Sequence, residues 1–353
     1  MRNASRALPL LLLLVTLPLA SSLASAQATT LESVRASGAV RCGVNPEFPG
    51  FSSANSLGAF SGFGIDVCRA VAAAVFGDGE AFEAVPVDAD EQFAALAARR
   101  FDVLLRNVTW TLGSNARHGE FVGTHFHDGQ GFMTPRQTGL RSALELDDRR
   151  ICVERDTSAE LNAADFFIAS EIRYRPVYFD DRAAAFAGYA AEECDAITTD
   201  RASLAARRSG LDSPEAHVIL PELISKEPFG PMVRPDDVGW ENVVRWSLNC
   251  MIDAEELGIA SGDVAGRIAR AADASEGGAE PATSAVSNLL GITGDAGEAL
   301  GLRPRWCADI VRLVGNYGEV YERHVGPDTP LGLRRGINAL WSDGGLIHAP
   351  PVR

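Results

Sequence analysis

The sequence lacks the short motifs that mark several large classes of enzyme. It contains no P-loop, no glycine-rich dinucleotide fingerprint and no serine nucleophile elbow, which argues against phosphoryl transfer, nicotinamide-dependent chemistry and serine hydrolase catalysis. The six cysteines include no Cys-x-x-Cys pair, so a zinc site or a thioredoxin-like redox centre is not expected. We therefore expect the protein to have neither a cofactor nor a metal.

Basic residues are scarce as well. The chain has 32 Lys and Arg against 47 Asp and Glu, which gives a formal net charge of −15. Nucleic acids and anionic membrane surfaces attract proteins through a basic footprint, so neither is an expected partner. No apolar run after residue 26 is long enough to cross a bilayer. The remaining length, roughly 325 residues, exceeds the usual size of one hydrophobic core and predicts two lobes.

Residues 1–26 have the features of a cleaved export signal. Arg2 and Arg6 give a positive start, residues 10–17 are almost continuously apolar, and Ala24-Ser25-Ala26 is a small-residue cleavage site. The alternative is an N-terminal membrane anchor, but the apolar run is shorter than the roughly 20 residues that span a bilayer. The sequence therefore predicts a periplasmic protein.

Export makes the six cysteines candidates for disulfides. Cys42 and Cys68 lie in the first strand and helix patterns of the chain, and Cys152 and Cys194 lie at strand-like segments of the middle region. We therefore favour the pairs 42–68 and 152–194, because each is local to one lobe. Cys250 and Cys307 lie on helical patterns and would form either a third bridge or two buried thiols.

Strand and helix patterns alternate along the first two thirds of the chain, which indicates a mostly parallel sheet in each lobe and an α/β fold. Two extended segments, at residues 130–134 and 217–234, bracket the middle region. Such paired crossings suit a hinge that closes two lobes around a ligand. The predicted organisation is residues 27–134 for the first part of lobe 1, 135–224 for an inserted lobe 2, and 225–353 for the rest of lobe 1 with a helical C-terminal extension.

Polar side chains follow two of the predicted strands. Residues 106–111 (Arg-Asn-Val-Thr-Trp-Thr) come after the apolar run at 101–105, and Thr199-Asp200 follows the run at 196–198. Ligands of open α/β sheets bind outside the carboxyl ends of the strands. The alternative is that these residues only cap the helices that follow.

The order of several longer motifs resembles one protein family. The chain closely resembles the periplasmic substrate-binding proteins of general L-amino acid ABC transporters, solute-binding family 3. The motifs that carry the resemblance are Phe48-Pro49-Gly50-Phe51, Gly62-Phe63-Gly64-Ile65-Asp66-Val67-Cys68-Arg69-Ala70-Val71, Arg106-Asn107-Val108-Thr109-Trp110-Thr111, Asp128-Gly129-Gln130-Gly131-Phe132-Met133, Glu160-Leu161-Asn162, Thr198-Thr199-Asp200, Ile224-Ser225-Lys226-Glu227-Pro228, Gly315-Asn316-Tyr317-Gly318-Glu319 and the stretch from Val325 to Leu333.

The resemblance implies a type II two-lobe binding-protein fold, a monomer that binds an amino acid or similar zwitterion, and an ABC permease as partner. It also implies a set of ligand-binding residues. Phe48, with Phe51, would form an aromatic wall, while Asn107 and Thr109 would offer hydrogen bonds from the first lobe. Thr157 and Ser158 at a helix start would hold the ligand carboxylate, as such sites favour anions. Asp200 would pair with the ligand ammonium.

Two positions depart from the family pattern. Ser114 stands where the family has an arginine that clamps the carboxylate, so that Arg106 or Arg117 would have to supply the guanidinium. Asp156 stands where the family has a glycine, directly before Thr157. Both changes point to altered ligand specificity. We include Arg106 and Ser114 in the predicted ligand-binding set.

Three functions remain open at this point. The first is delivery of an amino acid to a permease, and the second is a degenerate paralogue that acts as a sensor or binds a partner protein. The third is a dehydratase-type enzyme on the same fold, which would need a cleft acid or base with a shifted pKa. Glu227 is a possible acid, although the family's hinge motif accounts for it without chemistry. We predict a binding protein and not an enzyme.

Overall fold

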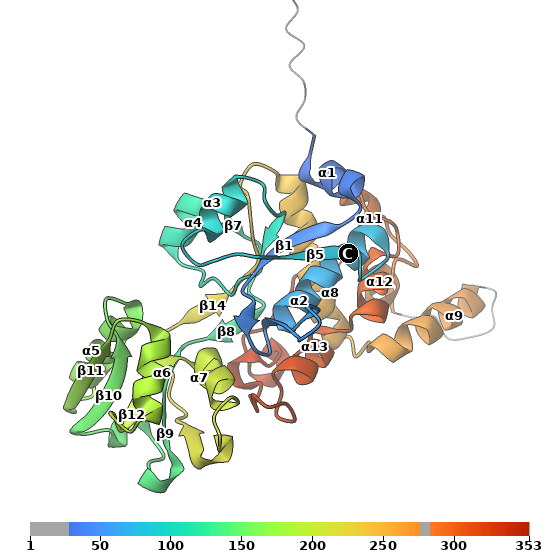
Figure 1. Ribbon diagram of the computed structural model, residues 1–353. Coiled ribbons are helices and arrows are strands. Elements are labelled where there is room, and N and C mark those ends of the chain that lie inside the picture. The colour runs from blue at the N-terminus through green and yellow to red at the C-terminus, as the bar shows by residue number, and fades with distance from the viewer. Residues whose placement is uncertain (1–27, 276–282, 353) are drawn as a thin grey trace, which may run out of the picture.

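The structure is a computed structural model that describes residues 28–275 and 283–352. The predicted export signal, residues 1–26, lies outside the described residues. Two lobes, each built around its own sheet, are joined by a narrow connection, as Figure 1 shows. This arrangement confirms the predicted two-lobe α/β fold. Within the described ranges, no helix combines the length and apolarity needed to cross a bilayer.

The first lobe has a five-stranded sheet in the order β5-β1-β6-β15-β7. Strand β1 is parallel to both β5 and β6, whereas β15 is antiparallel to β6 and β7. Both faces of β1 are buried, as is typical of parallel strands covered by helices. The strands are β1 Val40–Val44, β5 Phe82–Pro86, β6 Val103–Leu104, β7 Glu120–Phe121 and β15 Met232–Val233.

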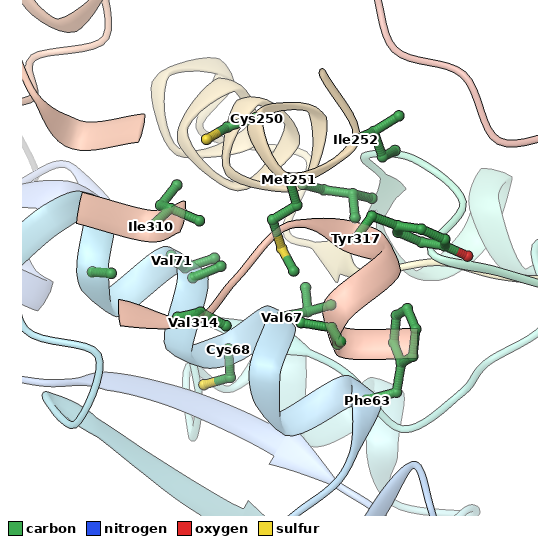
Figure 2. Close-up of a cluster of buried hydrophobic side chains, with 14 of the residues drawn as sticks. Phe63, Val67, Cys68, Val71, Cys250, Met251, Ile252, Ile310, Val314 and Tyr317 are labelled. Carbon is green, nitrogen blue, oxygen red and sulfur yellow. The ribbon is translucent and has the colours of Figure 1, made fainter. Parts of the chain in front are cut away.

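Four helices form the main core of this lobe with the sheet: α2 Phe63–Phe76, α8 Val238–Glu256, α12 Trp306–Leu313 and α13 Tyr317–His324. Figure 2 shows Val67 and Val71 of α2 packed with Met251 of α8 and Val314. Helix α2 ends at Gly77, whose φ of 72° lies in the left-handed region that glycine adopts without steric penalty. The C-terminal third of the chain therefore completes the core of the first lobe.

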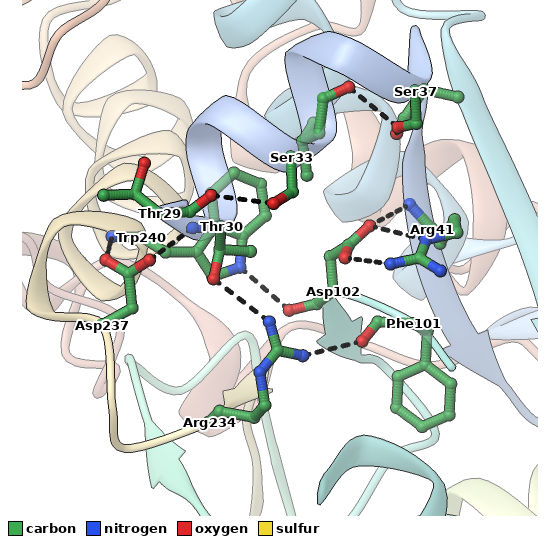
Figure 3. Close-up of polar contacts among 12 residues, drawn as sticks. Thr29, Thr30, Ser33, Ser37, Arg41, Phe101, Asp102, Arg234, Asp237 and Trp240 are labelled. Atoms are coloured by element: carbon green, nitrogen blue, oxygen red, sulfur yellow. Dashed lines mark hydrogen bonds and ion pairs between the residues drawn. The ribbon is translucent and has the colours of Figure 1, made fainter. Parts of the chain in front are cut away.

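The N-terminal helix α1 (Thr30–Ser37) is fastened to this core by polar contacts (Figure 3). The backbone N–H of Thr30 donates to Asp237, and Arg234 donates both to the Thr30 hydroxyl and to the carbonyl of Phe101. Asp102 beside them is 2% exposed and accepts from Arg41. Segments far apart in the sequence are thus held together at one end of the first sheet.

The second lobe has a five-stranded sheet in the order β11-β10-β12-β9-β13, in which β10, β11 and β12 are parallel and β9 is antiparallel to β12 and β13. Alternate residues of β10 face opposite sides. Ile151 and Val153 pack in the cluster that contains α5, and Cys152 packs with residues of α6 and α7. The elements are β9 Gln130–Pro135, β10 Arg149–Glu154, α5 Ser158–Ala169, β11 Tyr174–Phe179, α6 Arg182–Ala190, β12 Ala196–Asp200, α7 Arg201–Arg208 and β13 His217–Ile219.

The chain crosses between the lobes in two antiparallel strands, β8 (Phe126–Asp128) and β14 (Glu227–Phe229). Sequence analysis takes residues 130–134 as the first crossing, but the structure makes them part of β9, which is buried in the second sheet. The crossing lies a few residues earlier, in β8, where the side chain of Asp128 is held by hydrogen bonds. Its carboxylate accepts from the backbone N–H groups of Gly129 and Ala202.

The C-terminal segment braces this connection. The side chain of Asn338 accepts from the N–H of His127 and donates to its carbonyl, so it occupies the free edge of β8. Arg208 of the second lobe donates to the carbonyl of Leu331. The remaining elements are α3 Gln92–Ala97, α4 Leu112–His118, α9 Val264–Ser275, α10 Ser284–Leu289, α11 Ala296–Ala299, strands β2 Glu47–Phe48, β3 Ser52–Ala54 and β4 Phe60–Ser61, and 3-10 turns at Arg136–Thr138, Ala143–Glu145, Pro214–Ala216, Ser261–Asp263, Gly336–Asn338 and Trp341–Asp343.

All six cysteines form disulfides. Cys42 is bonded to Cys68 and Cys152 to Cys194, which are the pairs that sequence analysis favours. Cys250 of α8 is bonded to Cys307 of α12, so the pair that the sequence leaves open is a third bridge. Each bridge lies within one lobe, and none restricts the connection between the lobes.

Candidate functional site

A cleft of about 1140 Å³ lies between the two lobes, beside the connecting strands. It lies at the carboxyl ends of the parallel strands, where open α/β sheets bind their ligands. Its walls come from both lobes and from β14. The lining residues are Asn45, Glu47, Phe48, Pro49, Arg106, Asn107, Thr109, Thr111, Ser158, Asn162, Arg182, Ala183, Phe186, Ala187, Asp200, Ser203, Ala206, Arg207, Gly210, Leu211, Ser225, Lys226, Glu227 and Phe229.

An aromatic pair stands on the first lobe. Phe48 lines the cleft, and its ring stacks on that of Phe51 with centroids 4.7 Å apart. Phe51 is fully buried, does not line the cleft, and meets Phe126 edge to face. Of the two predicted wall residues, Phe48 is therefore placed to touch a ligand, and Phe51 supports it from behind.

Asn107 is the most unusual side chain of the first-lobe wall. Its backbone φ of 58° lies in the left-handed region, which asparagine tolerates better than most residues. Within the described residues, neither its amide nitrogen nor its amide oxygen has a hydrogen-bond partner, although both atoms are buried. Buried polar groups are almost always paired, so an amide left free at the wall of a cleft suits a ligand. Thr109 lines the same wall and bridges to Phe229 of β14.

Arg106 is the arginine that the first lobe presents to the cleft. Its Nε atom donates to the carbonyl of Val87 at 2.8 Å, which holds the side chain in place. Burial lowers the pKa of Arg106, and the positive charge of Arg182 on the other lobe lowers it further. Arginine keeps its charge in proteins, so the guanidinium remains available for an anion.

Ser114, in contrast, is not among the cleft-lining residues. It is the third residue of α4, and its side chain exchanges capping hydrogen bonds with the N-cap residue Thr111. The Ser114 hydroxyl also lies 3.1 Å from the carbonyl of Thr109. Its hydrogen-bonding capacity is used within its own turn. Arg117 does not line the cleft either, so of the two arginines considered for the clamp only Arg106 does.

Three helices of the second lobe begin beside the cleft. Their N-cap residues are Thr157 for α5, Asp181 for α6 and Asp200 for α7, and each cap accepts a backbone hydrogen bond from its first turn. Ser158 and Arg182, the first residues of α5 and α6, line the cleft. Free N–H groups and helix dipoles make such positions favourable for anions.

The hydroxyl of Thr157 is used to cap helix α5. Its hydroxyl accepts from the N–H of Glu160 and donates to the carbonyl of Glu154, and it does not line the cleft. Asp156 has a φ of 59°, a left-handed conformation that explains why glycine suits this position in the resembling family. Its side chain is exposed and outside the cleft lining. Of the predicted pair at this helix start, Ser158 is placed to contact a ligand.

Asp200 lines the cleft but already has partners. One carboxylate oxygen accepts from the N–H of Ser203 at 2.8 Å, as the cap of α7. The other lies 3.2 Å from Nη1 of Arg182. The same guanidinium nitrogen is 3.2 Å from the Ser203 hydroxyl. Asp200 is thus held rigidly, with one oxygen toward a half-exposed arginine that a ligand could displace or share.

Glu227 and Asp128 add negative charge near Asp200. Glu227 lines the cleft and accepts from the Ser225 hydroxyl at 2.7 Å. Burial and the neighbouring charge of Asp200 raise the pKa of Glu227. The same two causes raise the pKa of the fully buried Asp128 in β8. A cation bound beside Asp200 would relieve this repulsion between carboxylates.

Sequence analysis did not name five of the charged or polar lining residues: Asn45, Glu47, Arg182, Ser203 and Arg207. Arg182 follows β11 at the start of α6, so the rule of polar residues at strand ends could have found it. Ser203 and Arg207 lie on α7 behind Asp200 and gave no such signal. Among the described residues, no group of His, Cys, Asp and Glu is arranged to hold a metal ion.

The chain is similar to known proteins along most of its length. The family model for bacterial extracellular solute-binding proteins, family 3, matches residues 40–256. The putative amino-acid ABC transporter-binding protein YhdW of Escherichia coli strain K12 is 44% identical over 325 residues, 92% of each chain. The general L-amino acid-binding periplasmic protein AapJ of Rhizobium johnstonii is 42% identical, over 95% of this chain and 96% of its own.

A solved structure gives the same result for the fold. An ABC transporter periplasmic binding protein from Brucella ovis with glutathione bound is 43% identical, covers 93% of this chain and 100% of its own, and has a TM-score of 0.82. The family match spans both lobes and the connection between them. The chain therefore belongs to the bacterial extracellular solute-binding proteins, family 3.

Proposed function

We propose that this chain is a periplasmic binding protein that holds an amino acid or a related small zwitterion between its lobes and delivers it to an ABC permease. The observation that carries the proposal is the pairing of opposite charges across the cleft: Arg106 on the first lobe and Asp200 on the second. A zwitterion needs both of its charges met, because an unpaired charge in a closed cleft is costly.

In this proposal the ligand ammonium lies beside Asp200 and close to Glu227, where it offsets the repulsion between the two carboxylates. The ligand carboxylate turns toward Arg106 and the free amide of Asn107. Phe48 covers the apolar part of the ligand, and Thr109 and Ser158 offer hydroxyls from the two lobes. Thr157 and Ser114 act on the helices that bear them and not on the ligand.

Closure of the two lobes would exclude water from the bound ligand. The two lobes are joined by the short strands β8 and β14, and no disulfide crosses from one lobe to the other among the described residues. A change in backbone angles at these strands would rotate one lobe against the other. The bond from Arg208 to Leu331 crosses the lobes and would break or lengthen in that movement.

The names of the relatives support the transport role. YhdW and AapJ are both named as amino-acid-binding proteins, one of an ABC transporter and one periplasmic. We infer a periplasmic location and a permease partner for this chain on that basis, together with the predicted export signal. Binding without catalysis is the role that these names describe, and we propose the same here.

A ligand screen tests the proposal. The chain lacking residues 1–26 is purified, freed of bound ligand by unfolding and refolding, and melted in the presence of L-amino acids, dicarboxylates and simple amines. Ligand at 100 times its Kd should stabilise the native state by about 2.7 kcal/mol, which raises the melting temperature visibly. An L-amino acid should give the shift, and its parent amine and parent acid should not. A melting temperature that no amino acid or derivative changes would refute the proposal.

A further inference from the structure

Beyond the space between the lobes, the cleft continues along the second lobe as a groove between α6 and α7. Its α6 side is lined by Ala183, Phe186 and Ala187, which share one face of that helix. Its α7 side is lined by Ser203, Ala206 and Arg207, which share one face of that helix, and by Gly210 and Leu211 in the turn that follows it. The two helices lie side by side on one face of the sheet (Figure 1).

This groove has an apolar floor and a cationic group at each end. Phe186 is 8% exposed and forms part of the floor with the alanines and Leu211. Arg182 stands at the inner end, in contact with Asp200 and the Ser203 hydroxyl. Arg207 stands about 6 Å further out, one turn along α7 from Ser203.

The side chain of Arg207 is oriented by its contact with Phe186, and it forms no ion pair with another described residue. Its guanidinium lies over the ring of Phe186, 5.7 Å from the centroid, which leaves the edge donors free. Among the residues that the structure describes, no carboxylate lies within ion-pair distance of Arg207. Apart from Asp200 at the inner end, none of the residues that line the groove is acidic. Arg207 is exposed and lines the cleft, so its guanidinium is accessible to an anionic group of a ligand.

The size of the cleft also exceeds what one amino acid needs. A volume of about 1140 Å³ lies slightly above the range for sites of drug-sized ligands, which is roughly 300 to 1,000 Å³. A single amino acid between Arg106 and Asp200 would leave the groove empty.

We propose that the groove between α6 and α7 is a subsite for an anionic arm of the ligand, and that Arg207 binds the terminal carboxylate of that arm. The preferred ligand is then an elongated acidic derivative of an amino acid, such as a short peptide attached through its side chain. Its zwitterionic head lies at Asp200, its backbone or methylene arm runs over Phe186, and its end reaches Arg207. This inference rests on the proposed function, because the head group must bind first.

The test compares two probes that differ only in the charge of the far end. They are γ-L-glutamylglycine, which ends in a carboxylate, and γ-L-glutamylglycinamide, which ends in a neutral amide. Calorimetric titration should show the acid binding about tenfold or more tightly, as expected for a hydrogen bond to a charged partner. Arg207→Gln should reduce the ratio of the two affinities to about one. Equal affinities in the unaltered protein, or a ratio that Arg207→Gln leaves intact, would overturn the proposal.

Two further variants distinguish binding in the groove from general effects of charge and of folding. Arg141→Gln removes an exposed arginine of the same lobe outside the cleft, and should leave the ratio as it is in the unaltered protein. Ala187→Trp fills the groove at an exposed helix position, and should weaken both dipeptides far more than L-glutamine. Equal losses for all three ligands would contradict the subsite. If L-glutamine and both dipeptides fail to bind while another amino acid of the screen binds, the subsite is wrong and the proposed function stands.

Discussion

Replacing Asp200 by asparagine tests the ligand site most directly, because it removes a charge and keeps the shape. The carboxylate has two separate tasks. One oxygen caps α7 by accepting from the N–H of Ser203, and the other faces Arg182 and the cleft. Asparagine is as good an N-cap as aspartate, so helix α7 should keep its cap in Asp200→Asn. The ion pair with the half-exposed Arg182 contributes at most about 1 kcal/mol to folding.

The effect on binding should be much larger. An ammonium that loses its counter-charge in a closed cleft weakens binding by about 2–5 kcal/mol. Since each 1.4 kcal/mol corresponds to tenfold in affinity, the Kd should rise roughly 30-fold to several thousand-fold. Isothermal titration with the best amino acid of the screen measures this change. Thermal unfolding without ligand should show a melting temperature close to that of the unaltered protein.

Asp181→Asn provides the matched control. Asp181 caps the neighbouring helix α6 by accepting from the N–H of Ala184 at 2.7 Å, but it does not line the cleft. This variant should bind ligand with unchanged affinity. If Asp200→Asn binds within threefold of the unaltered protein, the ammonium does not pair with Asp200, and the proposed orientation of the ligand is wrong.

Three other substitutions address the carboxylate clamp and the pH dependence of folding. Arg106→Gln should weaken amino-acid binding by about 10- to 100-fold, which is the effect of losing a hydrogen bond to a charged group. Ser114→Ala should leave the Kd within about threefold and only lower the melting temperature, because Ser114 takes part in the cap of α4. If titration shows the larger loss of affinity for Ser114→Ala, the carboxylate clamp is at Ser114. Burial and the charge of Glu256 raise the pKa of Asp253 to about 7, so the native state binds an extra proton between about pH 4 and 7 and loses stability as pH rises through that range. Asp253→Asn should therefore raise the melting temperature by a few degrees at pH 8 and hardly at pH 4.5, and a difference that does not vary with pH would contradict this reasoning.

Local patterns in the sequence were sufficient to predict much of the fold. The apolar run at 196–198 predicted a strand, which the structure extends to Asp200 as β12. The helix start expected at Thr157 and Ser158 is found in the structure, as the N-cap and the first residue of α5. These elements were predictable because their signals, periodicity and capping, lie within a few residues of one another.

Strand pairings between distant segments were not predictable in the same way. Residues 130–135 join the second sheet as β9 because they pair with β12, about 65 residues later, and with β13 beyond it. Strand β15 enters the first sheet between β6 and β7 although it follows the whole second lobe in the sequence. A two-residue strand has too little pattern of its own to be recognised, and only its neighbours in space define it.

The sequence by itself predicted the two-lobe fold, one disulfide in each lobe and six of the residues that line the cleft. Tertiary structure decided which of those residues are free to bind. The hydroxyls of Ser114 and Thr157 are used in helix caps, whereas the side-chain amide of Asn107 has no hydrogen-bond partner in the part of the chain that the structure describes. Arg182 and Asp200 are 18 residues apart and meet only because α6 and α7 lie together on one face of the sheet. A polar side chain binds a ligand only if no nearer group has already satisfied it, and the nearer group is set by the packing of the whole lobe.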